Sequence, residues 1–565
     1  MKIGRLAALS LVVVVSSSVA GGVFGQKVLG SGSRLSDQLR LYTAILGAIE
    51  DQYVDEVKSD RLVSSSIREM LRTLDPHSNF LETREFGQLQ ERQRGSYYGL
   101  GITVQAIEGR ITVVSLFEGT PAHKLGLRTG DVISRVEGED ALGLTVDDAV
   151  KKLRGPKGSS VRITITRPGY ETPLEFTVIR DEIPLHSVPY SFMATKKTGY
   201  IRLQDFNETT ACRPQDGDDC ERELERALRQ LAEKGATSFI LDIRDNPGGL
   251  LDQAFAVSNL FLKKGQLVVY TRGRSKRDEM NYVTETESRW AAVPLVVLVS
   301  RHSASASEIV AGAIQDHDRG LIVGETTFGK GLVQTILPLR NSRGYALALT
   351  TARYYTPSGR LIQRDYGQTA LEDYVAPRDR KSCEEGSGDA KLTDSGRRVF
   401  GGDGITPDYC VEPEAASKFV SQLIARQAFL RFSRRFAASE ATGVADIAGT
   451  GSRSEVKSEH LLIVDRAFDA TPKLMDDFRA SLKDLEIDDV DDEFEANREP
   501  IRRLVVEEVL RQVFGEGEAR RRAAGWDPQL QRALELMPRA ELLQRDPRRF
   551  VAEREAELKV AERRN

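Results

Sequence analysis

The chain has 565 residues, which is too long for a single hydrophobic core and predicts about three or four domains. Charged residues make up 29% of the chain, yet the formal net charge is only −4, so the composition gives no indication of nucleic-acid binding. The six histidines are scattered, without a His-Glu-x-x-His pattern. The sequence therefore predicts no metal site and no cofactor.

The first 25 residues have the order of an export signal. Lys2 and Arg5 precede an apolar block at 6–15, and Ser18-Val19-Ala20 is a candidate cleavage site. The alternative is an uncleaved N-terminal anchor, since apolar residues continue to Phe24. No other run of about twenty apolar residues follows, so the sequence does not predict a polytopic membrane protein.

Export makes the four cysteines informative. None of them forms a Cys-x-x-Cys motif, and four cysteines allow three pairings. The simplest arrangement in an oxidising compartment is Cys212–Cys220 and Cys383–Cys410, each closing a polar loop. Four free thiols are the alternative.

Hydrophobic periodicity divides the rest of the chain. Residues 33–94 are predicted to form a helical domain, interrupted at 73–80 by "TLDPHSNF". Residues 95–182 alternate apolar and polar side chains around turn glycines, as short strands do, with one helix at 145–154.

Residues 183–412 are predicted to form a mixed α/β domain with crossover helices. Strand-like runs ("TGYIRL", "SFILDIR", "PLVVLVS" and "GLIVGE") alternate with predicted helices at 219–234, 250–263 and 306–316. Residues 380–405 are predicted to be an inserted polar loop. Residues 413–565 are predicted to be a charged helical extension with a linker near 438–452, serving as a packing or oligomerisation module or as solvated helix faces.

The stretch "SRHSASASEIVAGAIQ" (300–315) has two interpretations. Ser305 and Glu308 fit a capping box before an apolar helix, which is a purely structural feature. Alternatively Ser305 is a nucleophile, and then it needs a base. Neither a Gly-x-Ser-x-Gly elbow nor a well-placed histidine is present, because His302 lies only three residues away.

Lys330, in "GETTFGKGLVQT", is the candidate base. Burial lowers the pKa of a lysine ammonium, and serine-lysine pairs are a recognised catalytic arrangement. Gln334 falls on the same face of a predicted strand and could orient the amine. A solvent-exposed turn lysine is the structural alternative.

Two other features bear on chemistry. In "LDIRDNPGGLL" (241–251), Gly248 and Gly249 follow a predicted strand, so their amides could join that of Ala306 in an oxyanion hole, unless this is an ordinary turn. Gly324 to Lys330 also resembles a nucleotide-binding P-loop. Position 331 is Gly instead of Ser or Thr, however, and a strand, not a helix, is predicted to follow.

The motifs together resemble those of the carboxy-terminal processing proteases, the tail-specific S41 family of Ser-Lys endopeptidases with an inserted PDZ domain. The resemblance covers about residues 35–412. It rests on "YVDEV", "LDPHSNF", "GTPAHKLGLRTGDVI", "LDIRDNPGG", "SASASEIVAGAIQD", "GETTFGKGLVQ", "YYTPSGRLIQ" and "GITPD". It implies an α/β multidomain chain with a helical N-terminal segment, a β-sandwich or barrel-like PDZ domain, and a protease core of the crotonase-like (ClpP-like) type.

The resemblance also implies roles for residues. It assigns Ser305 as nucleophile, Lys330 as general base and Gln334 as its support, with Asp316 as an associated acidic residue. The oxyanion donors would be Ala306 and either Gly248 or Gly249. In the PDZ domain, the amides of Leu100, Gly101 and Ile102 in "YGLGI" would bind a peptide carboxylate, beside the helix at 145–154.

The function that this implies is a serine endopeptidase that recognises C-terminal tails of exported proteins and cleaves or processes them. We expect it in the bacterial periplasm, soluble or anchored to the inner membrane. Its partners would be protein or peptide substrates with exposed C-termini, with a possible adaptor or activating protein and a possible homo-oligomer formed through the N- or C-terminal helices. The alternative is a catalytically inactive PDZ scaffold that only binds protein C-termini.

Overall fold

The computed structural model describes residues 35–562 apart from several short gaps. These gaps are 118, 168–169, 218, 341–343, 368–372, 375–382, 384–388, 438–464, 486 and 488–489. The export signal and the linker near 438–452 that the sequence predicts therefore lie outside the described residues. Among the helices that are described, none combines the length and apolar character needed to cross a bilayer.

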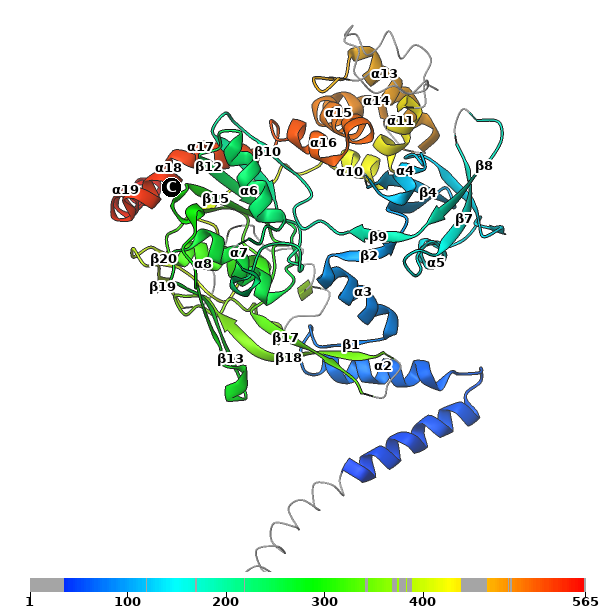
Figure 1. The fold of residues 1–565 in the computed structure, drawn as a ribbon, viewed down its shortest axis with the longest axis horizontal. Coiled ribbons are helices and arrows are strands. Elements are labelled where there is room, and N and C mark those ends of the chain that lie inside the picture. Colours follow the sequence, from blue (N-terminus) through cyan, green and yellow to red (C-terminus); the bar gives the residue numbers. More distant parts are fainter. Residues whose placement is uncertain are drawn as a thin grey trace, which may run out of the picture. The chain divides into compact units, whose positions relative to one another are not determined.

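The chain divides into two compact units. The first comprises Met1–Thr83 and Thr335–Thr350, and the second comprises Arg84–Gln334 and Thr351–Asn565. In the first unit, a helix at 35–52 and α2 (Ser59–Arg72) precede β1 (Asn79–Leu81), which pairs antiparallel with the start of β18 (Ala346–Tyr355) (Figure 1). Phe80 lies opposite Leu347 in this pair and is buried.

In the second unit, α3 (Thr83–Arg94) leads into a small β domain. Its strands follow the order β3-β4-β5-β7-β8, which leaves β3 at an edge of the sheet, and β6 pairs with β5. The helix predicted at 145–154 is α5 (Val146–Leu153), capped by Thr145, whose hydroxyl accepts the Asp148 N–H. The other elements are β2 (Ser96–Gly99), β3 (Ile102–Ile107), β4 (Arg110–Leu116), α4 (Pro121–Lys124), β5 (Val132–Val136), β6 (Glu139–Asp140), β7 (Ser160–Thr166), β8 (Leu174–Ile179) and β9 (Asp181–Pro184).

The α/β domain is built on a six-stranded sheet of order β10-β11-β12-β15-β16-β21. All neighbours are parallel except β10 and β11. The strands are β10 (Ser191–Met193), β11 (Thr198–Arg202), β12 (Ser238–Asp242), β15 (Leu295–Val299), β16 (Leu321–Gly324) and β21 (Tyr409–Cys410). Both β12 and β15 are buried along their whole length, as expected for parallel strands covered on two faces.

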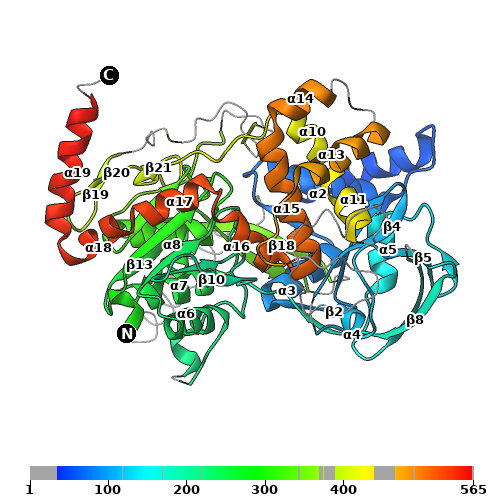
Figure 2. The same cartoon turned by 90° about the horizontal axis from the view of Figure 1, so that it is seen from above.

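Successive side chains of these strands pack into two different cores. Leu241 and Val297 face the core formed with α6 (Glu223–Glu233), α7 (Leu251–Phe261) and α8 (Ala306–Asp316). Ile240 and Val296 face the opposite core. That second core is formed with α17 (Pro528–Glu535), α18 (Met537–Arg545) and α19 (Pro547–Glu562). Figure 2 shows α6 and α7 on one side of the sheet and α17 and α18 on the other.

A second sheet has the order β1-β18-β13-β14, and β17 also pairs with β18. Its remaining strands are β13 (Leu267–Gly273), β14 (Asn281–Val283) and β17 (Leu332–Pro338), and the single-turn helices η1 (Pro214–Asp216), η2 (Lys276–Asp278) and η3 (Arg289–Ala292) lie in connections. Because β17 is a strand, the helix that a P-loop requires is not present after Lys330.

Both predicted disulfides, Cys212–Cys220 and Cys383–Cys410, are present. The prediction of a simple inserted loop at 380–405 is wrong for the part that is described. There β19 (Lys391–Leu392) and β20 (Arg398–Val399) form a hairpin, and Arg397 between them makes buried ion pairs with Asp318 and Asp408. These ion pairs could not be predicted from the sequence of the hairpin, because Asp318 and Asp408 lie outside it.

The C-terminal extension consists of two parts. Between residues 418 and 523, helices pack around their own core, which includes Phe429, Phe432, Phe478 and Phe494. These helices are α10 (Lys418–Ala425), α11 (Ala428–Ala437), α13 (Pro472–Ser481), α14 (Val490–Ala496), α15 (Arg498–Phe514) and α16 (Glu516–Ala523), with η4 (Leu482–Leu485) after α13. The last three helices instead cover the α/β sheet. The extension is therefore partly a component of the α/β domain.

Candidate active site

Ser305 lies at the point where β15 gives way to α8. It is the residue before the first helical residue, it is half-buried, and its backbone has φ 56° and ψ −113°. A positive φ is uncommon outside glycine, and such strained residues cluster at functional sites. The Ser305 N–H donates to Glu308 Oε2 at 2.8 Å, so the carboxylate half of the predicted capping box is formed.

Lys330 lies in the connection between β16 and β17. Its Nζ donates to Gln334 Oε1 at 2.8 Å, which is the contact that the spacing of these residues predicts. Lys330 is half-buried, so its amine is neither fully solvated nor fully removed from solvent.

The carboxylate of Glu308 joins the loop of the serine to the loop of the lysine. Its Oε2 accepts the N–H groups of Ser305 (2.8 Å) and Lys330 (2.9 Å). Its Oε1 accepts the Gly329 N–H (2.7 Å) and the Thr327 hydroxyl (2.6 Å). The backbone nitrogens of Ser305 and Lys330 therefore lie no further apart than two hydrogen-bond lengths. Glu308 is completely buried, and burial raises its pKa although these four hydrogen bonds act in the opposite direction.

Tyr354 of β18 makes a second connection between the two loops. Its hydroxyl lies 3.2 Å from the Ser305 carbonyl oxygen and also contacts the Lys330 carbonyl oxygen. The side chain is 1% exposed, and burial, followed by the nearby Glu308, raises the pKa of Tyr354 well above its usual value. The hydroxyl therefore stays protonated and can donate.

The glycine-containing turn after β12 packs directly on the serine loop. The Asn246 carbonyl oxygen accepts the Ala304 N–H (3.0 Å) and the Ser307 hydroxyl (2.8 Å). Gly248 has φ 93°, and a Cβ there would lie 2.8 Å from the Ala306 nitrogen and 2.9 Å from Ser305 Cβ. Only glycine fits this close approach.

The structure distinguishes the two glycine amides of this turn. The Gly248 N–H donates to Asn246 Oδ1 at 2.9 Å, so it already has an acceptor within the turn. Gly249 is exposed, and its N–H has no acceptor among the described residues. The Ala306 N–H, at the first position of α8, also lacks an acceptor in the described part of the chain.

Asp316 is far from this arrangement. It is the last residue of α8, about 16 Å along the helix axis from Ser305. It is 1% exposed, forms a 2.5 Å ion pair with Arg360 and accepts the Ser358 N–H. These contacts are those of a structural residue, and Asp316 has no part in the mechanism proposed below.

The predicted carboxylate-binding loop lies where β2 gives way to β3. The Leu100 and Gly101 carbonyl oxygens accept the N–H groups of Ala122 and Phe117, each at 3.0 Å, and the N–H groups of Leu100 and Gly101 themselves have no acceptor among the described residues. Ile102 begins β3, whose outer edge is free within its sheet and which packs beside α5. An edge strand beside a helix is the surface to which a peptide adds as an extra strand.

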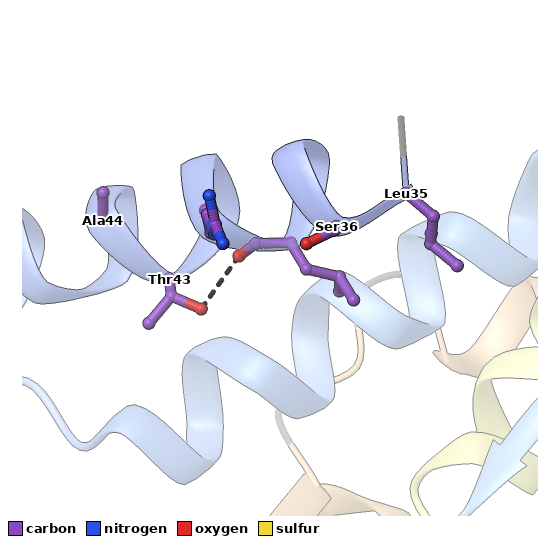
Figure 3. A pocket seen from close by; sticks show the side chains of 6 residues that line it. Leu35, Ser36, Thr43 and Ala44 are labelled. Atoms are coloured by element: carbon purple, nitrogen blue, oxygen red, sulfur yellow. Dashed lines mark hydrogen bonds between the residues drawn. The ribbon is translucent and has the colours of Figure 1, made fainter. Parts of the chain in front are cut away.

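A shallow hollow in the first unit does not involve these residues. It is lined by Leu35, Ser36, Leu39, Arg40, Thr43 and Ala44, all on the helix at 35–52 (Figure 3). A side-chain hydrogen bond runs from the Thr43 hydroxyl to the Leu39 carbonyl oxygen, within the helix. In the described ranges, no group of three His, Cys, Asp or Glu residues could hold a metal ion.

Two family models match the chain. That of peptidase family S41 covers residues 197–370, and that of the PDZ domain covers residues 112–167. A carboxy-terminal-processing protease from Bartonella bacilliformis is 40% identical over 330 residues, which are 58% of this chain and 73% of that protein. The carboxy-terminal processing protease CtpA from Bacillus subtilis is 34% identical over 358 residues, which are 63% and 72% of the two chains.

The chain belongs to the carboxy-terminal processing proteases of peptidase family S41. It is thus a serine-type peptidase with a PDZ domain, and the resemblance and the fold class inferred from its motifs are confirmed. The solved photosystem II D1 C-terminal processing protease is 28% identical and covers 66% of this chain and 92% of its own, at a TM-score of 0.33.

Sequence reasoning missed part of this site. Glu308 was recognised only as a helix cap, although its other three donors are residues 327, 329 and 330. Asn246 and Tyr354 stand inside the motifs "RDNPGG" and "YYTPSGR", but neither motif indicates which backbone groups their side chains would contact.

Replacing Gly248 tests the close approach of the turn to the serine. We expect Gly248→Ala to lower peptidase kcat by about a hundredfold, because the new methyl group must displace Ser305 or Ala306. Gly265→Ala is the matched control: it has φ 86° but nothing within 4 Å of the added Cβ, so it carries the backbone strain alone. Equal activity in the two variants would contradict the expectation.

Replacing Glu308 tests the shared carboxylate. In Glu308→Gln an amide –NH₂ takes the place of one acceptor oxygen and faces two donors, which should lower the free energy of unfolding by about 1–3 kcal/mol and also lower kcat. Urea unfolding and peptidase assays on the same samples measure both effects. The control Glu233→Gln changes an exposed ion pair at the end of α6. A Glu308→Gln variant with the parent's kcat would show that the carboxylate is dispensable.

Proposed function

We propose that Ser305 and Lys330 form the catalytic dyad of this protease. The observation that carries the proposal is the Glu308 carboxylate, which accepts the backbone N–H groups of both residues and so holds their loops together. Gln334 supports the lysine through its 2.8 Å contact with Nζ. A histidine base finds no support, because His302 is separated from Ser305 by only two residues.

The mechanism begins with Lys330 as a free amine. It takes the Ser305 hydroxyl proton as Oγ attacks the substrate carbonyl carbon, and a tetrahedral oxyanion forms. When the C–N bond breaks, the Lys330 ammonium gives its proton to the leaving amine. A water molecule then attacks the acyl ester while Lys330 removes its proton, and hydrolysis releases the new carboxyl terminus and restores the Ser305 hydroxyl.

The backbone N–H groups of Ala306 and Gly249 are the donors best placed to stabilise the oxyanion by hydrogen bonds. Both N–H groups lack an acceptor among the described residues, whereas the Gly248 N–H is bonded to Asn246 Oδ1. Donors that need no reorganisation stabilise a developing negative charge most effectively. The sequence does not decide between Gly248 and Gly249 as the second oxyanion donor. We therefore propose Gly249.

We propose that the PDZ domain selects the substrate. The N–H groups of Leu100 and Gly101, which lack an acceptor among the described residues, suit a C-terminal carboxylate, and the open edge of β3 suits the peptide residues that precede that carboxylate. The paired cysteines and the predicted export signal support a periplasmic location, soluble or anchored, and hence substrates that are exported proteins.

Self-association is also part of the proposal. Leu35, Leu39, Leu41 and Ile45 on the N-terminal helix each expose half or more of their surface, which is unusual for residues of this type. Contact with a second copy of the chain or with an adaptor protein would cover them.

Mutation of the dyad separates a protease from an inactive scaffold. The parent, Ser305→Ala and Lys330→Ala are incubated with a loosely folded protein ending in an apolar tail, and fragments are identified by mass spectrometry. We expect each replacement to lower kcat by on the order of 10⁴-fold, because the nucleophile and its base act as a unit. Lys263→Ala, an exposed lysine after α7, is the control. Cleavage by Lys330→Ala at the parent's rate would refute the dyad, and tail binding without cleavage by the parent would support the scaffold.

A change in the PDZ loop tests substrate selection. In Gly101→Ala the added Cβ would lie 2.3 Å from Thr120, which distorts the carboxylate loop. We expect the preference for an apolar tail over a charged tail, measured as a ratio of kcat/KM, to fall toward one. Gly109→Ala, with φ 71° and nothing within 4 Å, should keep the parent's ratio. A Gly101→Ala enzyme with an undiminished ratio would place tail recognition elsewhere.

A further inference from the structure

The last helices of the chain meet the α/β domain at Arg244. This residue lies two positions after the end of β12 and immediately before the turn that approaches Ser305. Its Nη2 is 2.8 Å from Oδ2 of Asp527, and its Nη1 donates to Gln529 Oε1 at 2.8 Å. Asp527 is the N-cap residue of α17, and Gln529 lies in the first turn of that helix.

Arg244 also belongs to a buried charge cluster at the end of β12. Its Nε donates to both oxygens of Asp242 at 3.0 Å, and Asp242 further accepts Arg202 Nη1 at 3.1 Å and the Tyr200 hydroxyl at 2.5 Å. Burial alone would raise the pKa of Asp242, but the Arg244 and Arg202 guanidinium groups outweigh it and hold that pKa well below its usual range.

The cluster is electrically balanced only when α17 is in place. Asp242 and Asp527 carry two negative charges, and Arg202 and Arg244 carry two positive charges. Without Asp527 one guanidinium charge is left without a counter-charge at a site that is mostly removed from water. Breaking a buried ion pair by removing one partner is costly because of that uncompensated charge.

The polypeptide that follows Arg244 leads directly to the serine loop. The Asp245 N–H donates to the Ser300 hydroxyl at 2.9 Å, and Asn246 accepts the Ala304 N–H. Residues 245–249 therefore lie between Arg244, which α17 holds from one face of the sheet, and the start of α8 on the other face. Arg244 is joined to Asn246 by two peptide bonds and to Gly249 by five, so the position of Arg244 bears directly on this turn.

We propose that Asp527 and Gln529 are positioning residues of the protease: they hold Arg244 and thereby fix the 245–249 turn beside Ser305. The kinetic consequences of this proposal rest on the proposed function, which makes the Gly249 amide of the turn an oxyanion donor. The structural part, that α17 restrains the turn, stands independently. Gln529 contributes a second anchor, because it is 3% exposed and its Nε2 also donates to the Val411 carbonyl oxygen at 2.7 Å.

The test replaces the charge of Asp527 while keeping its helix cap. Asn caps a helix as well as Asp does, so Asp527→Asn removes the ion pair with Arg244 but can still accept the Gln529 and Leu530 N–H groups. Asp546→Asn is the matched control, because Asp546 accepts the Arg549 N–H at the start of α19 in the same group of helices. A third variant, Asp527→Glu, keeps a carboxylate for Arg244 but lengthens the side chain that caps the helix.

The first readout is kinetic and uses the full-length chain. For Asp527→Asn we expect kcat to fall roughly ten- to a hundredfold with KM little changed, since positioning is lost at the reacting centre and not in tail binding. Affinity for a peptide boronic acid, which forms a tetrahedral adduct with an active-site serine, should fall by a similar factor. The control should match the parent, and Asp527→Glu should retain more kcat than Asp527→Asn, whereas a role as helix cap alone would favour the Asn variant.

The second readout does not depend on turnover. Amide hydrogen exchange, followed by mass spectrometry on peptides covering 240–250 and 300–308, should be faster in Asp527→Asn than in the parent and in Asp546→Asn. Unchanged exchange would overturn the proposal whether or not the parent cleaves any substrate. Faster exchange with an inactive parent would support the restraint by α17 and count against the proposed function alone. Faster exchange with unchanged kcat and boronate affinity would overturn the catalytic part of the proposal.

Discussion

The buried carboxylate of Glu308 is the interaction on which the active site depends. Four donors from two separate loops converge on its two oxygens, and they include the backbone amides of both proposed dyad residues. A group this deeply buried is tolerated only when its hydrogen-bonding capacity is satisfied. The same requirement fixes the geometry, because neither loop can move without leaving an oxygen or an amide without a partner. Tyr354 strengthens this arrangement from the carbonyl side of the same two residues.

A second constraint acts through the parallel sheet. Its strands alternate between a core shared with α6, α7 and α8 and a core shared with α17, α18 and α19. The serine is at the N-terminus of a helix on the first face, while the turn beside it is attached to Arg244, which is held from the second face. The site is thus supported from both sides of one sheet. A half-buried serine with a strained backbone can be maintained because its surroundings are rigid.

Local patterns in the sequence predicted much of this architecture. The apolar runs at β12 and β15, the start of α8 at Ala306 and the strand after Lys330 all follow from periodicity and capping signals. The contact between Lys330 and Gln334 was predicted from the alternation of side chains along a strand, although Lys330 lies two residues before the first residue of β17. Both disulfides are those of the simplest of the three pairings that the sequence allows.

Contacts between distant residues could not be predicted in this way. Arg244 and Gln529 are 285 positions apart, and nothing in the charged sequence of α17 distinguishes a helix that covers a sheet from a solvated one. The partners of Glu308 and the burial of Arg397 between two aspartates have the same origin. In each case the local sequence around a polar residue gives no sign of its partners, which the fold brings to it from distant parts of the chain. Asp316 shows the reverse, because a motif position that suggested chemistry is used to hold Arg360.

The position of α17 to α19 in the chain also affects when the protein can finish folding. Leu530, Leu536 and Phe550 cover the face formed by residues such as Ile240 and Val296, yet they follow those residues in the chain by about 230 to 310 positions. The apolar face of the sheet therefore stays uncovered until these helices dock on it. The 245–249 turn also lacks its support from Asp527 until then. The α/β domain of a newly made molecule is thus complete only when α17 to α19 have docked on the sheet.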